Sequence, residues 1–98
     1  MFNTTNLVRL IAISGKSFEI IRNAQHICNA NGAINTVEHK KVIHFLVDTD
    51  ISAGDWVKLL STGELFYILE TEFQNLKDNS RVLNAYYQTE NDYFTASN

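Results

Sequence analysis

Residues 53–68 read AGDWVKLLSTGELFYI, and this stretch decides the predicted fold class. It contains two runs of apolar and aromatic residues separated by Ser61-Thr62-Gly63. Glycine in such a loop can adopt the left-handed backbone conformation that a three-residue hairpin connection needs. The stretch therefore predicts a β-hairpin between residues 56–60 and residues 64–73, with a Gly-Asp corner in front of it.

The second arm of this hairpin is expected to be half exposed, because apolar and acidic side chains alternate along it. One predicted face carries Leu65, Tyr67, Leu69 and Phe73, and the other carries most of the acidic residues, Glu64, Glu70 and Glu72. Phe66 and Tyr67 then lie on opposite faces of the strand. One of these rings is expected to enter the core, and the other is left for a neighbouring molecule.

The rest of the chain repeats the pattern of short strands between turns. Runs of β-branched and aromatic residues predict further strands at residues 17–22, 42–47 and 81–88. Residues 42–47 are apolar on both faces apart from His44, as expected of a strand that is buried in a barrel or sandwich. Six or seven short strands in 98 residues predict an all-β fold, either a small antiparallel barrel or a sandwich. The length fits a single domain spanning residues 1–98.

The predicted connections are rich in turn-forming residues. Residues 48–55 and 77–80 are expected to link strands. Asn31-Gly32 matches a two-residue type I′ turn, which needs a left-handed conformation at both positions. The residues up to 30 and those from 33 are therefore expected to pair with each other as a hairpin.

The two ends of the chain are less regular. Residues 6–13 fit either a strand or a short helix capped by Thr5 or Asn6, and their alternation favours the strand. Residues 89–98 are polar apart from Tyr93 and Phe94, so we expect them to fray.

Cysteine content and hydropathy bear on the cellular location. Cys28 is the single cysteine and cannot form an internal disulfide bond. The first 13 residues lack the basic start and apolar run of a secretory signal, and no stretch approaches the roughly 20 apolar residues of a membrane helix. The sequence therefore predicts a protein that is made in a reducing compartment and is not in the membrane.

Charge is unevenly distributed along the chain. Residues 1–47 hold five basic and two acidic side chains, a net charge of +3, whereas residues 48–98 hold three basic and nine acidic ones, a net charge of −6. If the two halves lie on different faces, the molecule is a dipole that can stack head to tail with copies or partners. An uneven scatter of solvating charge is the alternative.

Two motifs that could bind ions fail on their spacing. Gly15-Lys16-Ser17 resembles the end of a phosphate-binding loop, but Leu10 stands where the first glycine of that loop is required. Asp48, Asp50 and Asp55 resemble part of a calcium loop, but apolar residues stand at ligand positions and no closing glutamate follows. These aspartates are instead expected to accept hydrogen bonds from backbone amides of the corner.

The histidines and the cysteine also lack the spacing of a metal or catalytic site. His26 and Cys28 are predicted to share one strand face, where contact between them is possible. Together with His39 and His44 they do not form the paired spacings of a structural zinc site. We expect a buried thiol beside a surface histidine, and a hydrogen-bonded His44 in the core or an interface. The sequence therefore predicts no catalytic residues, no metal and no cofactor.

Aromatic and basic residues are the best candidates for an interaction surface. They are Trp56, Phe66, Tyr67, Tyr86 and Tyr87, with Arg22, Lys40 and Lys41. A base-stacking surface also needs a basic groove, yet the half of the chain that carries these rings has a net charge of −6. Nucleic-acid binding therefore remains an alternative that would use the basic first half.

Residues 42–72 resemble small β-barrel structural proteins of tailed bacteriophages and prophages, of the head-closure or head-to-tail joining type found in the neck. The resemblance lies in a hydrophobic strand, the sequence Ile51-Ser52-Ala53-Gly54-Asp55-Trp56-Val57, a glycine-centred hairpin, and Leu65-Phe66-Tyr67-Ile68-Leu69. It implies adjoining barrel strands, assembly of copies into a ring around the DNA passage, and no catalytic residues.

From these observations we expect a non-enzymatic phage or prophage structural protein, a head-tail connector component that acts in virion assembly through protein contacts. It is expected to be a homo-oligomer or to bind other particle proteins, in the cytoplasm of the bacterial host or in the virion. Trp56 is expected to plug the barrel end or to form a subunit contact. Besides the nucleic-acid-binding barrel, a small phage-encoded inhibitor of a host protein is the second alternative.

Overall fold

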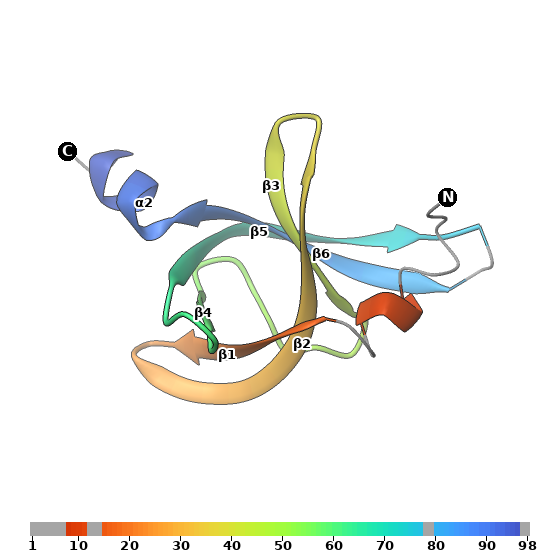
Figure 1. The fold of residues 1–98 in the computed structure, drawn as a ribbon, viewed down its shortest axis with the longest axis horizontal. Coiled ribbons are helices and arrows are strands. Elements are labelled where there is room, and N and C mark those ends of the chain that lie inside the picture. Colours follow the sequence, from red (N-terminus) through yellow and green to blue (C-terminus); the bar gives the residue numbers. More distant parts are fainter. Residues whose placement is uncertain (1–7, 12–14, 78–79, 97–98) are drawn as a thin grey trace.

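The computed structural model shows an antiparallel barrel closed by six strands (Figure 1). The structure describes residues 8–11, 15–77 and 80–96. The strands are β1 (Lys16–Arg22), β2 (Gln25–Val37), β3 (Lys40–Leu46), β4 (Trp56–Leu59), β5 (Leu65–Asn75) and β6 (Arg81–Thr89), followed by helix α2 (Glu90–Ala96). Their order around the barrel is β1-β2-β3-β6-β5-β4, and β4 closes the barrel on β1. The predicted all-β fold is confirmed, in its barrel form.

The barrel core is formed largely by alternate residues of the strands. Phe18 and Ile20 of β1 both point inward and are fully buried, as expected. The Phe18 ring meets the Phe45 ring edge-on, with centroids 5.8 Å apart. Strand β3 is buried on both faces: Ile43 and Phe45 lie in the core, and on the outer face Leu46 packs against a smaller apolar cluster built on Ile11, Leu76 and Val82.

The predicted hairpin turn at Asn31-Gly32 is wrong. These residues lie within β2, and the turns fall on either side of it, at Asn23-Ala24 and Glu38-His39. All four turn residues have positive φ, from 52° to 69°. Gly32 serves packing instead, since a Cβ there would lie 2.7 Å from Ile43 Cγ2 and 2.9 Å from Phe45 Cε1.

The predicted hairpin of β4 and β5 is confirmed. Gly63 has a φ of 79°, and its N–H donates to the carbonyl oxygen of Leu59 at 2.7 Å. The predicted apolar face of the second arm is wrong, however. Phe66 and Ile68 enter the core instead, and an irregularity between Ile68 and Glu70 changes the face of the residues that follow. Phe66 and Tyr67 do lie on opposite faces, with Phe66 buried.

Both ends of the chain differ from the preferred expectation. Residues 8–11 are helical, so the helix alternative is confirmed for them, and Ile11 is fully buried. The predicted capping residues, Thr5 and Asn6, lie outside the described residues. The predicted fraying of residues 89–98 is wrong for Glu90–Ala96, which form α2. Its aromatic residues pack on the barrel, which stabilises the helix. Residues 97–98 lie outside the described residues.

The turn between β5 and β6 falls where the sequence predicts it. The N–H of Leu76 donates to the carbonyl oxygen of Ser80 at 2.8 Å, which brings the two strands together. Residues 78–79 at its centre lie outside the described residues.

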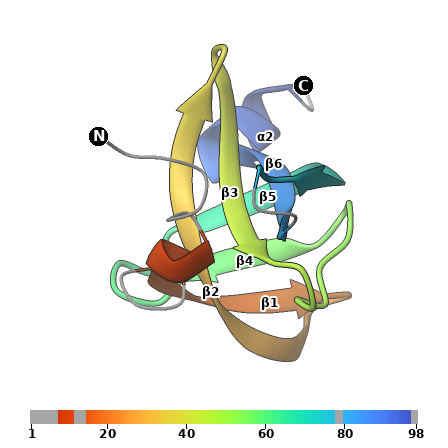
Figure 2. The same ribbon diagram turned by 90° about the vertical axis from the view of Figure 1, so that its right-hand side faces the viewer.

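Two hairpins extend beyond the barrel wall. β1 pairs with β2 only as far as Gly32, and β4 pairs with β5 only as far as Tyr67. The remainder of β2 with the start of β3, residues 33–41, forms the β2–β3 arm, which stands above the barrel in Figure 2. The remainder of β5 with the start of β6, residues 69–81, forms the β5–β6 arm, which extends to the right in Figure 1.

Candidate protein interface

Four of the predicted interaction residues come together where the β2–β3 arm leaves the barrel. Lys40, Lys41, Tyr86 and Tyr87 line one pocket of about 310 Å³, together with His39, Leu69 and Glu70. The pairing of β3 with β6 places them there, because Val42 lies opposite Tyr86. The lining of this pocket combines cationic, acidic, aromatic and aliphatic side chains.

The two lysines of this pocket are already engaged within the chain. Lys40 Nζ lies 5.6 Å from the centroid of the Tyr86 ring, a cation–π distance. Lys41 Nζ lies 3.5 Å from Asp92 Oδ2 of α2. These contacts tie the start of β3 to β6 and to the C-terminal helix.

Tyr86 stands between this pocket and a second one. Its hydroxyl donates a hydrogen bond to Glu72. This hydrogen bond and then partial burial raise the pKa of Tyr86 above its ordinary value. The second pocket, also about 310 Å³, lies on the outer face of the sheet and is lined by Asn35, Val37, Val42, His44, Glu72, Gln74, Leu76, Asn84 and Tyr86.

A chain of polar side chains crosses the floor of the second pocket. His44 is buried, and its Nδ1 lies 2.7 Å from Asn84 Oδ1. Its Nε2 lies 3.2 Å from Asn35 Nδ2, and Asn84 Nδ2 donates to Gln74 Oε1 at 2.8 Å. The prediction that His44 is a hydrogen-bonded core residue is confirmed. Both imidazole nitrogens of His44 are hydrogen-bonded to amide side chains. Because the four linked residues belong to β2, β3, β6 and β5, this row of hydrogen bonds holds the four strands together.

The five predicted aromatic residues lie in three different places. Phe66 and Tyr87 belong to the core, with ring centroids 4.7 Å apart. The ring centroids of Trp56 and Tyr67 lie 5.2 Å apart. The ring centroid of Tyr93 in α2 lies 5.0 Å from that of Trp56 and 4.5 Å from that of Tyr67. Tyr86 lies between the two pockets. The structure therefore places Trp56 beneath helix α2, and sequence reasoning missed this contact.

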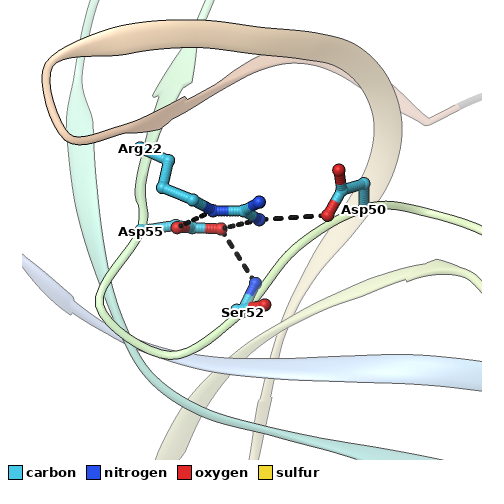
Figure 3. A network of polar contacts seen from close by, with 4 residues as sticks. All are labelled: Arg22, Asp50, Ser52 and Asp55. Carbon is cyan, nitrogen blue, oxygen red and sulfur yellow. Dashed lines mark hydrogen bonds and ion pairs between the residues drawn. The ribbon is translucent and has the colours of Figure 1, made fainter.

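Arg22, the remaining predicted interaction residue, belongs to an internal ion-pair network (Figure 3). Its Nε and Nη2 donate to the two carboxylate oxygens of Asp55, each at 2.9 Å, and Nη2 also donates to Asp50 at 3.0 Å. Hydrogen bonds to Asp55 and then to Asp50 raise the pKa of Arg22. The bidentate geometry clamps the end of β1 to the corner that precedes β4.

Asp55 has the corner role that the sequence predicts for these aspartates. It is only 2% exposed, and its Oδ2 accepts the N–H of Ser52 at 2.8 Å. The Gly-Asp corner is thus held by one carboxylate that serves both the backbone and Arg22. The partner of this carboxylate was not visible in the sequence, because the two residues are 33 positions apart.

His26 and Cys28 do not share a strand face as predicted. Cys28 lies opposite Ile20 and His26 lies opposite Ile21, so β2 carries an extra residue between them. The Cys28 side chain packs against the core, and burial is the main cause that raises the pKa of its thiol. His26 is exposed, and its Nδ1 lies 2.8 Å from Glu19 Oε2.

The described residues contain neither a cluster of metal-binding side chains nor a membrane-spanning helix. In the part of the chain that the structure describes, no three histidine, cysteine or acidic side chains gather as a group that could hold a metal ion. Within the same residues, no helix combines the length and the apolar character that crossing a membrane requires.

Comparison with known proteins gives no relatives: no family model, no curated protein and no solved structure matches the chain.

Proposed function

We propose that the protein is a non-enzymatic assembly subunit that works through protein–protein contacts, of the head-closure type in a tailed phage or prophage. It would act in the cytoplasm of the bacterial host or in the virion. One observation carries this proposal: large apolar side chains are exposed on the two arms. Ile34 and Val37 of the β2–β3 arm are 39% and 45% exposed, and Leu69 and Phe73 of the β5–β6 arm are 47% and 54% exposed. Apolar side chains on projecting arms favour burial against another molecule.

The basic and acidic halves of the sequence lie on different sides of the barrel, which supports contact surfaces of unlike charge. β1, β2 and β3 come from the basic half of the chain and form one side of the barrel, whereas β4, β5 and β6 come from the acidic half. Lys58 of the acidic side and Glu19 of the basic side lie 3.8 Å apart, so each side also carries a charge of the opposite sign at this boundary. Glu70 and Glu72 remain exposed on β5. Surfaces of unlike charge favour head-to-tail contacts between copies.

The engagement of Arg22 and Lys41 in ion pairs argues against the nucleic-acid alternative. Arg22 is neutralised by Asp55 and Asp50, and Lys41 lies against Asp92. Phosphate binding would need these cations to be free, and it would weaken steeply with salt. A gel shift with single-stranded DNA at low salt that disappears as salt is raised would favour that alternative.

Electron microscopy of the purified protein, combined with binding to capsid and neck proteins of a tailed phage, tests the proposal. We expect ring-shaped particles, or stable complexes with those proteins. A protein that forms no rings and binds none of them would contradict the proposal. A one-to-one complex with a host protein, without rings, would instead support the inhibitor alternative.

A further inference from the structure

The two arms each leave one strand edge unpaired among the described residues. Closing the barrel removes such edges elsewhere, but residues 33–37 of β2 pair only with β3, and residues 69–75 of β5 pair only with β6. Unpaired N–H and C=O groups on a strand edge can accept another strand. The two edges have similar lengths and belong to one continuous four-stranded sheet, β2-β3-β6-β5.

The backbone direction on β5 follows from one residue. The Ile68 N–H donates to Asp55 O at 2.9 Å, and its carbonyl accepts the Gly54 N–H at 2.8 Å, so its backbone points away from β6. Opposite residues of antiparallel strands alternate between hydrogen-bonded and non-hydrogen-bonded pairs. Because Ile68 and Tyr87 are such a non-hydrogen-bonded pair, the backbone N–H and C=O of Tyr87 also point away from β5. Tyr86 and every second residue along β6 then bond to β5.

This alternation fixes which groups of β5 are free. The partners of Tyr86, Asn84 and Val82 are Glu70, Glu72 and Gln74, and these bond to β6. The residues between them direct their N–H and C=O groups to the open edge: Thr71, Phe73 and Asn75. The free edge of β5 therefore offers three outward-facing amide positions.

The same alternation carried across β3 identifies the free groups of β2. Ile43 bonds to Ala85 of β6, so Val42 and His44 bond to β2. The backbone N–H and C=O groups of Ile34 and Thr36 therefore point to the open edge of β2. The Thr36 N–H accordingly finds no strand partner and donates to the side-chain oxygen of Asn35 at 2.8 Å.

We infer that the free edge of β5 in one copy pairs antiparallel with the free edge of β2 in the next copy. The inference rests on the proposed function and names its subunit contact. In this pairing Ile34 lies opposite Phe73 and Thr36 opposite Thr71, so outward-facing amides meet each other. Full pairing requires the Asn35 side chain to release the Thr36 N–H.

The side chains agree with this register. Ile34 is paired within its own chain with Ile43, and Phe73 with Leu83, and both of those partners are core residues. Ile34 and Phe73 therefore lie on the same side of the sheet, and each would cover the exposed apolar surface of the other.

Charge selects this pairing over the pairing of two β5 edges. Two β5 strands would bring Glu70 and Glu72 of one copy against the same residues of another, which is repulsive. Residues 33–37 of β2 carry no charge, and the single acidic residue of this arm, Glu38 in the turn at its tip, is followed by Lys40 and Lys41. The favoured contact is therefore heterologous, and it closes into a ring when the rotation between copies allows.

Two proline variants test the pairing. Thr71→Pro removes an outward N–H from β5, and Thr36→Pro removes one from β2; proline is tolerated at such edge positions. Each variant alone is expected to associate roughly tenfold or more weakly than the wild-type chain, because backbone hydrogen bonds are lost at every junction. An equal mixture is expected to form a dimer and nothing larger, since one intact β5 edge meets one intact β2 edge. Light scattering measures the masses.

Matched variants serve as controls. Val47→Lys changes an exposed apolar residue outside the arms and should associate like the wild-type chain. Circular dichroism checks that the proline variants are folded. If either is not, Phe73→Lys and Ile34→Lys replace them in the same mixing experiment, because each places a charge on one edge only.

The outcomes separate this inference from the proposed function. Assembly that survives both folded edge variants would overturn the inference while leaving the proposed function intact. Loss of assembly in Thr71→Pro but not in Thr36→Pro would indicate pairing of two β5 edges and also overturn it. A wild-type chain that stays monomeric but binds phage particle proteins would overturn the inference alone.

Discussion

At the residue scale, one buried carboxylate fixes the corner from which β4 starts. Asp55 accepts hydrogen bonds from Arg22 and from the Ser52 N–H, so its removal leaves the Ser52 N–H without this acceptor and leaves Arg22 only its hydrogen bond to Asp50. The sequence does not distinguish the aspartates of residues 48–55 from one another. Their surroundings in the fold decide which of them has a structural role. Asp48 is exposed, unlike Asp55.

We therefore expect Asp55→Ala to lower the free energy of unfolding by about 1 to 3 kcal/mol, the range for a buried group that loses its partner. Asp48→Ala is the matched control and should change it by less than about 0.5 kcal/mol, as is usual for an exposed substitution. Urea denaturation measures both values. Equal effects of the two substitutions would contradict the role of Asp55.

Tyr86 makes the stability depend on alkaline pH. Its folded-state pKa is raised because its hydroxyl donates to Glu72, so the protonated phenol is the form that stabilises the fold. This contribution is complete below the ordinary tyrosine pKa of about 10 and is lost as pH rises through the folded-state value. Tyr86→Phe should cost about 1 kcal/mol at neutral pH and should flatten the alkaline fall in unfolding free energy. An unchanged alkaline slope in Tyr86→Phe would disprove this contribution.

At the element scale, packing overrides the local turn signal. Asn31-Gly32 has the strongest hairpin signal in its region, yet Gly32 continues β2 because β3 side chains occupy the space of a Cβ. The actual turns use Ala24, Glu38 and His39 in a conformation that costs L-residues energy. A propensity rule could not find these turns, since only the closed sheet determines where β2 must begin and end.

Two glycine exchanges test this assignment of the turns. Ala24→Gly removes the left-handed penalty and should raise the free energy of unfolding by roughly 0.5 to 1 kcal/mol. Gly32→Ala forces a methyl group against Ile43 and Phe45 and should lower it by about 1 to 3 kcal/mol. Thermal unfolding followed by circular dichroism reports both. A stable Gly32→Ala protein would mean that β2 does not approach β3 as described.

Helix α2 is the element that sequence patterns missed. Its seven residues make a short helix without a buried residue, and a polar C-terminal stretch normally frays. The informative signal was its aromatic pair, because the Tyr93 and Phe94 rings lie 5.0 Å and 6.4 Å from the Trp56 ring. That contact joins residues far apart in the chain, so it depends on the barrel being formed.

Trp56 is the sole tryptophan and therefore reports on the docking of α2. Tyr93→Ala should expose the indole ring and shift its fluorescence maximum to longer wavelength. Thr95→Ala changes an exposed residue of the same helix and should leave the spectrum unchanged. Identical spectra for both variants would show that α2 does not cover Trp56.

At the scale of the whole molecule, the sequence predicts strands better than it predicts their partners. The strand positions near residues 17–22, 42–47 and 81–88 were predictable because short runs of β-branched and aromatic residues between turn formers are visible locally in the sequence. The closure of β4 on β1 and the clamp between Arg22 and Asp55 were not, since they depend on pairing over long separations. The two arms are also features that the sequence did not predict. They exist only because β2 and β5 are longer than their barrel neighbours β1 and β4.

The central claim is that this barrel acts by assembling with copies of itself through its two arms. The mass of the wild-type chain, measured by light scattering over a wide concentration range, tests the claim most directly. We predict a particle whose mass is a fixed multiple of the 11.2 kDa subunit and which breaks down in the edge variants. A mass of 11.2 kDa at every concentration would contradict the claim.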